Sequence, residues 1–392
     1  MERAYWLAWS HIKDVGPILI KRLHEQFGSL ALAWQAEPAD LLTVEGIGLV
    51  TAAQIQELRS HINPEHLLEQ HETQYPRFWT PADADYPSLL WEIPDPPAVL
   101  YYRGPLRPNH TSTITVSIVG TRRPSPYGRR WTQRLSRHLS QQEFTIVSGM
   151  AAGIDAYAHQ SCIAVQGQTI AVLGTGVDVI YPRSNARLYQ SILETGLILS
   201  EYPDGVSPDR SHFPRRNRII AGLSHATLVT EAPERSGALI TAYLANDYGR
   251  QVYTLPDGLD NPTARGCLTL IDTGATVVMG EKYLVTDLLA MTNRENTISD
   301  GHHTYETKNA GVDDSVLSQE THPPRPESTS TSDVELDETL RYIFQMMPNK
   351  PVSLDNLAKT TQLDTSDLLS GLLQLEVAEV IVRLPGGQYQ RS

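Results

Sequence analysis

The sequence contains only two cysteines, Cys162 and Cys267, among its 392 residues. Two cysteines cannot build a disulfide framework or a cysteine-rich zinc site, and such scarcity is typical of proteins in a reducing compartment. The chain also has no run approaching 18 apolar residues, and its first residues lack the basic and then apolar pattern of a secretion signal. We therefore expect a cytoplasmic protein that does not cross a membrane, in which each cysteine is a small core residue.

The familiar nucleotide-binding motifs are absent as well. No Gly-x-Gly-x-x-Gly follows the first strand of the predicted core, and no Gly-x-x-x-x-Gly-Lys-Ser/Thr occurs. Dinucleotide chemistry and P-loop hydrolysis are therefore disfavoured. Asp155 and His159 lie four residues apart on one predicted helix face, but the sequence places no third ligand beside them. We expect structural hydrogen bonding there, and we predict no metal, no cofactor and no catalytic residue.

Acidic residues outnumber basic ones by 45 to 32, which gives a formal net charge of −13. Spread evenly, this charge would argue against a nucleic-acid partner. The excess acid lies outside residues 112–291, however, where 16 basic residues meet 15 acidic ones and all but one of the basic residues are arginine. Arginine suits bidentate contact with phosphate, so this pattern predicts a local anion site, with a solvated helix face as the alternative for either group alone. The arginines gather in two groups: Arg122, Arg123, Arg129, Arg130, Arg134 and Arg137, and Arg210, Arg215, Arg216 and Arg218.

Composition divides the chain into five segments. Residues 1–65 are predicted to form short helices, residues 66–111 an ordered connector rich in Pro and aromatics, and residues 112–291 the core. Residues 292–332 hold only four Ile, Val and Leu side chains among polar and acidic residues, which predicts a disordered linker. Residues 333–392 predict three helices and a β-hairpin with a Gly-Gly turn, which together form a winged-helix domain.

The two flanking modules give divided signals about DNA. Residues 44–48 form an apolar-Glu-Gly-Ile-Gly turn between two predicted helices, which is the helix-hairpin-helix or SAM-like shape whose turn amides can hold a phosphate. Glu45 lies within that turn, however, and the module is acidic overall. An interaction or structural domain is therefore as good an interpretation as a DNA-binding one. Residues 360–382 contain no Lys or Arg, so we favour protein contact over duplex reading for the winged helix.

The core shows short apolar, β-branched runs that alternate with helical stretches. Such runs predict βαβ units and a parallel sheet covered on both faces. The predicted fold class is α/β, with a Rossmann-like, doubly wound, mostly parallel sheet. The runs are residues 114–119, 144–147, 169–173, 197–199, 227–230, 252–255 and 276–279.

Ligands of an open parallel sheet bind beyond the carboxyl ends of its strands. Five predicted strands are followed by loops rich in Gly, Ser or Arg, and five such loops at one edge favour a polyanion site over five unrelated turns. Glu231, beside the Ser-Gly start of a helix, could instead position a ribose or a water, which keeps an enzymatic interpretation open. The candidate DNA-binding residues are Gly120, Thr121, Arg122, Arg123, Ser125, Ser148, Gly149, Gly153, Gly174, Arg183, Asn185, Arg215, Arg216, Asn217, Arg218, Ser236 and Gly237.

Five motifs follow one another along the core: Gly120-Thr121-Arg122-Arg123-Pro124-Ser125-x-Tyr127-Gly128, Ser148-Gly149-Met150-Ala151-x-Gly153-Ile154-Asp155, Gly174-x-Gly176-x-Asp178-x-x-Tyr181-Pro182, Phe213-Pro214-x-Arg216-Asn217-Arg218 and Glu231-Ala232-x-x-x-Ser236-Gly237. Together they resemble the DNA-processing protein A family, also called DprA or Smf. The helical N-terminal domain, the Asp85-Tyr86-Pro87 connector and the winged helix fit the same family more loosely.

The resemblance implies a Rossmann-like protein that binds single-stranded DNA without sequence preference. It also implies a homodimer formed through the core, loading of the RecA recombinase during natural transformation, and no catalytic activity. The family's phosphate loop falls on Gly120, Thr121 and Arg122, and the basic residue of its Tyr-Pro-Lys/Arg segment falls on Arg183. Ala152 stands where many members have Arg, which removes one cation.

Two other hypotheses remain beside DNA binding. One is a nucleotide-binding or nucleotide-hydrolysing enzyme that uses the same sheet edge, with Glu231 and Asp155 as acid/base candidates. The other is a structural scaffold without a ligand. A titration of labelled poly-dT against a mononucleotide competitor separates all three.

Overall fold

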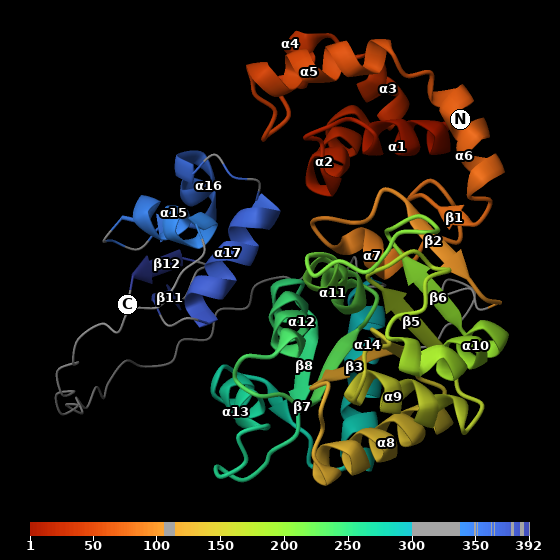
Figure 1. Ribbon diagram of the computed structural model, residues 1–392, viewed down its shortest axis with the longest axis vertical. Helices are drawn as coiled ribbons and strands as arrows, with labels where there is room; N and C mark the ends of the chain where they lie inside the picture. Colours follow the sequence, from red (N-terminus) through yellow and green to blue (C-terminus); the bar gives the residue numbers. More distant parts are fainter. Residues whose placement is uncertain are drawn as a thin grey trace, which may run out of the picture. The chain divides into compact units, whose positions relative to one another are not determined.

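The computed structural model describes residues 1–105, 114–299 and 338–391, except for residues 349, 351, 362, 364, 378, 379 and 385–387. The chain divides into two compact units, Met1–Ile298 and Ser299–Ser392. Figure 1 shows the elements of each unit, coloured from red at the N-terminus to blue at the C-terminus.

A nine-stranded sheet forms the centre of the first unit within the described residues, in the order β1-β2-β6-β5-β4-β3-β7-β8-β9. The strands from β6 to β9 in this order are parallel, and β1 and β2 add an antiparallel edge. This confirms the predicted mostly parallel α/β core. The bounds are β1 Phe78–Trp79, β2 Leu100–Arg103, β3 Thr115–Gly120, β4 Thr145–Ser148, β5 Thr169–Leu173, β6 Leu197–Ser200, β7 Ala226–Glu231, β8 Gln251–Thr254 and β9 Thr276–Val277.

Helices cover both faces of this sheet (Figure 1). Side chains alternate across β3, so that Val116 and Ile118 pack under one helical layer and Val119 packs under the other. The first layer contains α8 Pro126–Gln141, α9 Ile154–Ile163, α10 Ala186–Thr195 and α14 Glu281–Ser299. The second contains α7 Ser88–Glu92, α11 His212–Gly222, α12 Gly237–Asp247 and α13 Arg265–Asp272.

The chain order creates a switch point at the centre of the sheet. From β3 the chain runs outward through β4 and β5 to β6, and it then returns to place β7 on the opposite side of β3. Loops that leave β3 and β7 therefore diverge to opposite faces and leave a crevice between the two strand ends. In doubly wound sheets this position is where ligands bind.

The N-terminal helices form a small core of their own around two buried tryptophans, Trp6 and Trp9. They join the connector at Trp91, whose ring lies 5.6 Å edge-on from that of Trp6, while Lys21 Nζ donates to the Trp91 and Ile93 carbonyls. Gly48 precedes α5, as the hairpin interpretation expects, but the helix before this turn is only four residues long. The bounds are α1 Glu2–Ser10, α2 Pro17–Phe27, α3 Leu30–Gln35, α4 Pro38–Leu41, α5 Leu49–Ser60 and α6 Pro64–Gln74.

The second unit has the predicted winged-helix arrangement of three helices and a β-hairpin. Its strands pair in the order β10-β12-β11 around a core that includes Ile343, Leu372 and Tyr389. The predicted Gly-Gly turn between β11 and β12 lies outside the described residues. The bounds are α15 Glu338–Met346, β10 Val352–Ser353, α16 Leu354–Thr361, α17 Thr365–Val377, β11 Ile381–Leu384 and β12 Gln388–Arg391.

The last helix of the core extends past a predicted boundary. The composition predicts a disordered linker from residue 292, but α14 continues to Ser299. Residues 281–299 contain neither Gly nor Pro, so nothing in the backbone ends the helix where the apolar pattern stops. The rest of that predicted linker, residues 300–332, lies outside the described residues.

Candidate nucleic-acid interface

The candidate site is the edge of the sheet at the carboxyl ends of its parallel strands, which we call the rim. It comprises residues 120–125 after β3, residues 148–153 after β4, residues 174–185 after β5 and the start of α11 at His212. Thr121 links the first two loops, because its amide donates to the Glu231 carbonyl at 2.7 Å and its carbonyl accepts from the Ile154 amide at 3.2 Å. These bonds tie the loop after β3 to the end of β7 and to the start of α9.

Two glycines permit this close packing. Gly153 has φ +83°, and a Cβ there would lie 2.4 Å from the Thr121 carbonyl oxygen. At Gly120 a Cβ would lie 2.6 Å from Ile154 Cγ1 and 2.7 Å from the Glu231 carbonyl oxygen. Gly120 and Gly153 thus allow the loops to pack closely, since a side chain at either position would force them apart.

Glu231 supports the first loop from below. Its carboxylate is 1% exposed, and it accepts from the Ser125 amide at 2.8 Å and from the Thr263 hydroxyl. A Cβ at Gly128 would lie 2.0 Å from Glu231 Oε2, so α8 can pass over this carboxylate only because residue 128 is glycine. Both oxygens are engaged, which makes Glu231 a support for the loop instead of an accessible acid or base.

Asp155 and Arg216 are buried, oppositely charged residues that both bond to the backbone of the second loop. Asp155 Oδ2 accepts from the amides of Gly149 at 3.2 Å and Ala151 at 3.4 Å. Arg216 Nη1 donates to the carbonyls of Gly149, at 2.7 Å, and of Val172, which joins the ends of β4 and β5. Burial lowers the pKa of Arg216 to about 10 and raises the pKa of Asp155, and each opposite charge counteracts the other's shift.

His159, one turn after Asp155 on α9, bonds elsewhere. Its Nδ1 lies 2.6 Å from Thr169 Oγ1, and the Thr169 hydroxyl itself donates to the Ile146 carbonyl. The imidazole therefore donates through Nδ1, and burial lowers its pKa to about 3. Within the described residues, no three His, Cys, Asp or Glu side chains are grouped so that they could hold a metal ion.

Three further predicted contact residues are buried supports. Arg218 pairs with Asp95 at 2.9 Å and Glu201 at 2.5 Å, and these carboxylates raise its pKa against the opposing effect of burial. Asn217 donates to the Gly237 carbonyl at 3.1 Å. Asn185 donates to the Met150 carbonyl at 2.9 Å. With Arg216, these side chains are buried and support the rim from inside.

The three predicted serines form hydrogen bonds with backbone groups. Ser125 caps α8 by accepting from the Gly128 amide at 3.1 Å, and Ser236 caps α12 by accepting from the Ala238 amide at 3.3 Å. Ser148 is buried and donates to the Ile118 carbonyl at 2.6 Å. Gly237, by contrast, is exposed, and a Cβ there would meet no atom within 4 Å. The N-termini of α8 and α12 thus begin on either side of the switch point.

Four predicted arginines remain exposed at the rim: Arg122, Arg123, Arg183 and Arg215. Arg122 and Arg183 have no carboxylate within salt-bridge distance in the part of the chain that the structure describes. Exposed guanidinium groups above glycine loops and two helix N-termini suit an extended phosphate backbone, because both the charges and the helix dipoles attract anions.

Two aromatic residues at the rim were missed by the sequence interpretation. The Phe213 ring lies 5.3 Å from the ring of Tyr181, which is 39% exposed, and Arg122 Cζ lies 5.7 Å from the Phe213 centroid. Gly174 leaves room for Phe213, because a Cβ there would lie 3.0 Å from its ring. The available signal was the position of each aromatic directly before a proline in an Arg-bearing loop.

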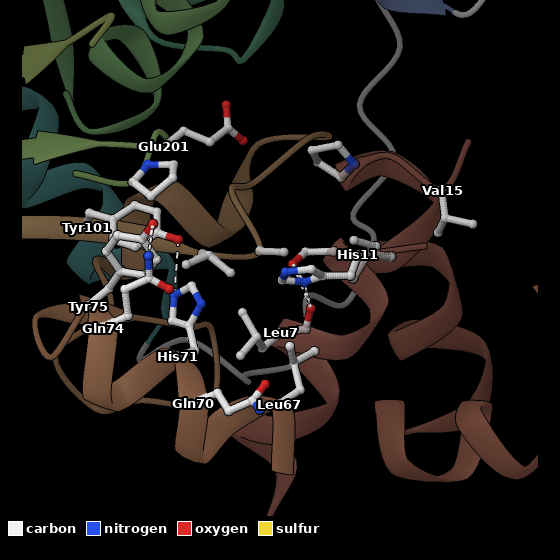
Figure 2. Close-up of a pocket in the computed structure, with 16 residues that line it drawn as sticks. Leu7, His11, Val15, Leu67, Gln70, His71, Gln74, Tyr75, Tyr101 and Glu201 are labelled. Carbon is white, nitrogen blue, oxygen red and sulfur yellow. Dashed lines mark hydrogen bonds between the residues drawn. The ribbon is translucent and has the colours of Figure 1, made fainter. Parts of the chain in front are cut away.

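A pocket in this unit lies elsewhere, between α1, α6 and β2 (Figure 2). It has a volume of about 550 Å³. His71 lines it and lies 3.0 Å from the Tyr101 hydroxyl, and burial, with nearby His11 and Arg3, lowers its pKa to about 4. This pocket carries a neutral imidazole and no exposed arginine, so it does not share the rim's chemistry.

Among the helices that the structure describes, none is both long enough and apolar enough to span a bilayer. The fold and the rim together define a class of two-module protein, namely a Rossmann-like core with an arginine-bearing rim, joined to a winged helix. The chain belongs to the DprA/Smf family, since the family model for DNA recombination-mediator protein A matches residues 77–289 and that for the DprA winged helix domain matches residues 323–387. This membership confirms the resemblance inferred from the five motifs.

Individual relatives agree with the family assignment. Protein Smf of Synechocystis sp. is 47% identical over 397 aligned residues, covering 100% of this chain and 99% of that protein. The crystal structure of DprA from Streptococcus pneumoniae matches with a TM-score of 0.62 and 33% identity, covering 73% of this chain and 97% of that one. A Helicobacter pylori DprA structure, described as showing a single-stranded DNA binding mode, matches with a TM-score of 0.50 and 32% identity over 54% of this chain and 96% of that one.

Proposed function

We propose that the rim binds the sugar-phosphate backbone of single-stranded DNA without sequence preference and presents the strand to the RecA recombinase. The observation that carries this proposal is the pair of exposed, unpaired arginines, Arg122 and Arg183, on a rim built from glycine loops and helix N-termini. Backbone phosphates are the same at every nucleotide, so this chemistry has no means of reading sequence. The DNA-binding Helicobacter relative is consistent with it.

Salt-dependent binding of oligo-dT tests the rim directly. Removing one arginine–phosphate interaction should flatten the plot of log affinity against log salt by about 0.7 for single strands, so Arg122→Ala with Arg183→Ala should flatten it by about 1.4. Arg187→Ala, an exposed arginine on α10, is the matched control. An unchanged affinity and slope in the double variant would show that the rim is not the DNA site.

Delivery of DNA to RecA is the second part of the proposal. The acidic flanking modules support it, because residues 360–382 lack Lys and Arg and are better suited to protein contact than to duplex binding. We expect the full chain to accelerate RecA-dependent ATP hydrolysis on single-stranded DNA, and the Arg122→Ala/Arg183→Ala variant to lose this effect. Equal stimulation of RecA by the wild type and the variant would show that RecA loading does not depend on Arg122 and Arg183.

We also propose a homodimer formed through the core. β9 ends the sheet with one edge unpaired within the described residues, and beside it Met279 is 75% exposed and Tyr283 is 54% exposed. An open strand edge next to apolar side chains is a surface that proteins usually cover. Sedimentation should show a dimer that Met279→Glu shifts toward monomer, and a monomeric wild type would refute this assignment.

The proposed role is that of a cytoplasmic DNA-binding protein without catalytic activity. The enzymatic alternative relied on Glu231 and Asp155 as acid/base groups. Both carboxylates are buried and already accept hydrogen bonds from the loops they support. Saturable binding of a mononucleotide with no gain in affinity for an oligonucleotide would favour that alternative.

A further inference from the structure

α8 carries a second group of arginines that the rim does not use. Arg129, Arg130, Arg134 and Arg137 are all exposed on this helix, and residues 121–142 contain no Asp or Glu. The opposite side of the helix, which includes Leu135 and Leu139, is buried against the sheet. The arginines therefore form one continuous outer surface, which we call the α8 face.

Aromatic rings hold several of these guanidinium groups in place. Arg130 Cζ lies 5.8 Å from the Tyr127 centroid, Arg134 Cζ lies 4.9 Å from that of Trp131, and Arg129 Cζ lies 4.7 Å from that of Tyr157 on α9. A guanidinium held near a ring loses less freedom when it binds an anion, because its position is already restricted. Arginines that only keep a helix surface soluble need no aromatic rings to hold their guanidinium groups in place.

The α8 face begins where the rim ends. Ser125 closes the first rim loop and caps α8, and the stripe Arg130, Arg134 and Arg137 extends about 10 Å further along the helix axis. We propose that a single strand bound at the rim continues over the α8 face, which holds the next part of its phosphate backbone and offers partly exposed Trp131 and Tyr127 for base contact. This inference rests on the proposed function of the rim.

One carboxylate opposes this role. Glu281, the first residue of α14, pairs with Arg134 through Nε and Oε1. The Glu281 carboxylate therefore competes with a phosphate for this guanidinium. Its removal is expected to strengthen binding at the α8 face, which is an effect that a purely structural ion pair would not produce.

The test compares oligo-dT of two lengths, about six nucleotides to occupy the rim alone and about thirty to reach the α8 face. Arg130→Glu with Arg137→Glu should leave the short oligonucleotide unaffected and weaken the long one. Losing two phosphate interactions should flatten the slope of log affinity against log salt by about 0.7 each. Between 50 and 200 mM salt, the affinity of the wild type for the long oligonucleotide should therefore fall about sevenfold more than that of the variant. Glu281→Gln should instead raise affinity for the long oligonucleotide alone.

The controls separate this inference from the proposed function. Arg187→Glu on α10 is a matched charge reversal and should leave both lengths bound as in the wild type. If the α8 variant binds the long oligonucleotide as the wild type does, the α8 inference is overturned, whether or not the rim binds. If short-oligonucleotide binding survives Arg122→Ala with Arg183→Ala, the rim assignment fails instead. Binding of polyglutamate, but not of long oligo-dT, through the α8 arginines would identify the face as a protein-docking surface and also overturn the inference.

Discussion

The guanidinium of Arg216 lies where a side chain at residue 149, just after β4, would be. The guanidinium donates from Nη1 to the Gly149 carbonyl at 2.7 Å, and a Cβ on Gly149 would lie 2.1 Å from that same nitrogen. The absence of a side chain at residue 149 is therefore what allows a buried arginine to link two strand ends under the rim.

Gly149→Ala should destabilise the core and weaken DNA binding, because the methyl group must displace Arg216 from its two carbonyl acceptors. Overpacking of this kind costs about 1–3 kcal/mol. Urea unfolding measures it, with Gly237→Ala as the control, since a Cβ at residue 237 meets nothing within 4 Å. Equal stability of the two variants would show that Arg216 relocates without cost.

Arg216→Met should be more damaging, because it removes the larger of the two positive charges, Arg216 and Arg122, that stabilise the buried Asp155 carboxylate. Removing the opposite charge from a buried carboxylate costs up to about 3–5 kcal/mol. Adding Asp155→Asn should restore part of the lost free energy of unfolding, since the buried charge is then removed. A double variant as unstable as Arg216→Met alone would mean that the arginine acts only through the strand carbonyls.

Glu231→Gln distinguishes a supporting carboxylate from a catalytic one. The amide cannot accept through both oxygens from Ser125 and Thr263, so we expect a loss of about 1–3 kcal/mol in stability and weaker oligo-dT binding. Nucleotide turnover should be absent from wild type and variant alike. Turnover that is present in the wild type and lost in the variant would instead make Glu231 a catalytic residue.

Phe213→Leu tests whether the rim stacks bases as well as binding phosphates. Leucine keeps an apolar contact with Gly174 and Tyr181 but removes the ring, and loss of a base–aromatic stack costs about 1–3 kcal/mol per base. Affinity for oligo-dT should fall by that amount while the salt slope stays unchanged. Phe213→Tyr should bind as the wild type does, and a similar loss in both variants would point to altered packing instead.

The free energy of unfolding should decrease as the pH is lowered, in part because of His71. Its folded pKa is about 4 against an ordinary 6.5, so the unfolded state takes up the proton first as the pH falls. The stability contributed by the neutral imidazole is complete above pH 6.5 and is lost between pH 6.5 and 4, at up to about 1.4 kcal/mol per pH unit. His71→Gln should flatten this slope, as followed by urea unfolding between pH 7.5 and 4.5.

The control for this prediction is His66→Gln, an exposed histidine on the same helix. It should keep the wild-type slope. His159, with its pKa lowered to about 3, should preserve part of the acid sensitivity even when His71 is replaced. A wild-type slope in His71→Gln would show that the histidine is not protonated on unfolding in this range.

Much of the fold followed from local pattern. Short apolar runs between helical stretches predicted the parallel sheet, and the five loop motifs predicted both the rim and the family. The end of α14 was missed because helix termination depends on capping and on breakers such as Gly and Pro, and the apolar pattern reports neither. Phe213 and Tyr181 were missed because their contact joins the loop after β5 to the start of α11.

The sequence by itself determined the order of modules, the arrangement of strands and helices, and the concentration of arginine in an otherwise acidic chain. Only the tertiary structure decided which arginines can meet a ligand. Arg215 and Arg216 are neighbours, yet the first is exposed and the second is buried, because α11 becomes covered on all sides from Arg216 onward. Acceptors distant in sequence, such as the carbonyl of Gly149 and the carboxylates of Asp95 and Glu201, compensate the buried charges of Arg216 and Arg218, whereas Arg122 and Arg183 remain exposed.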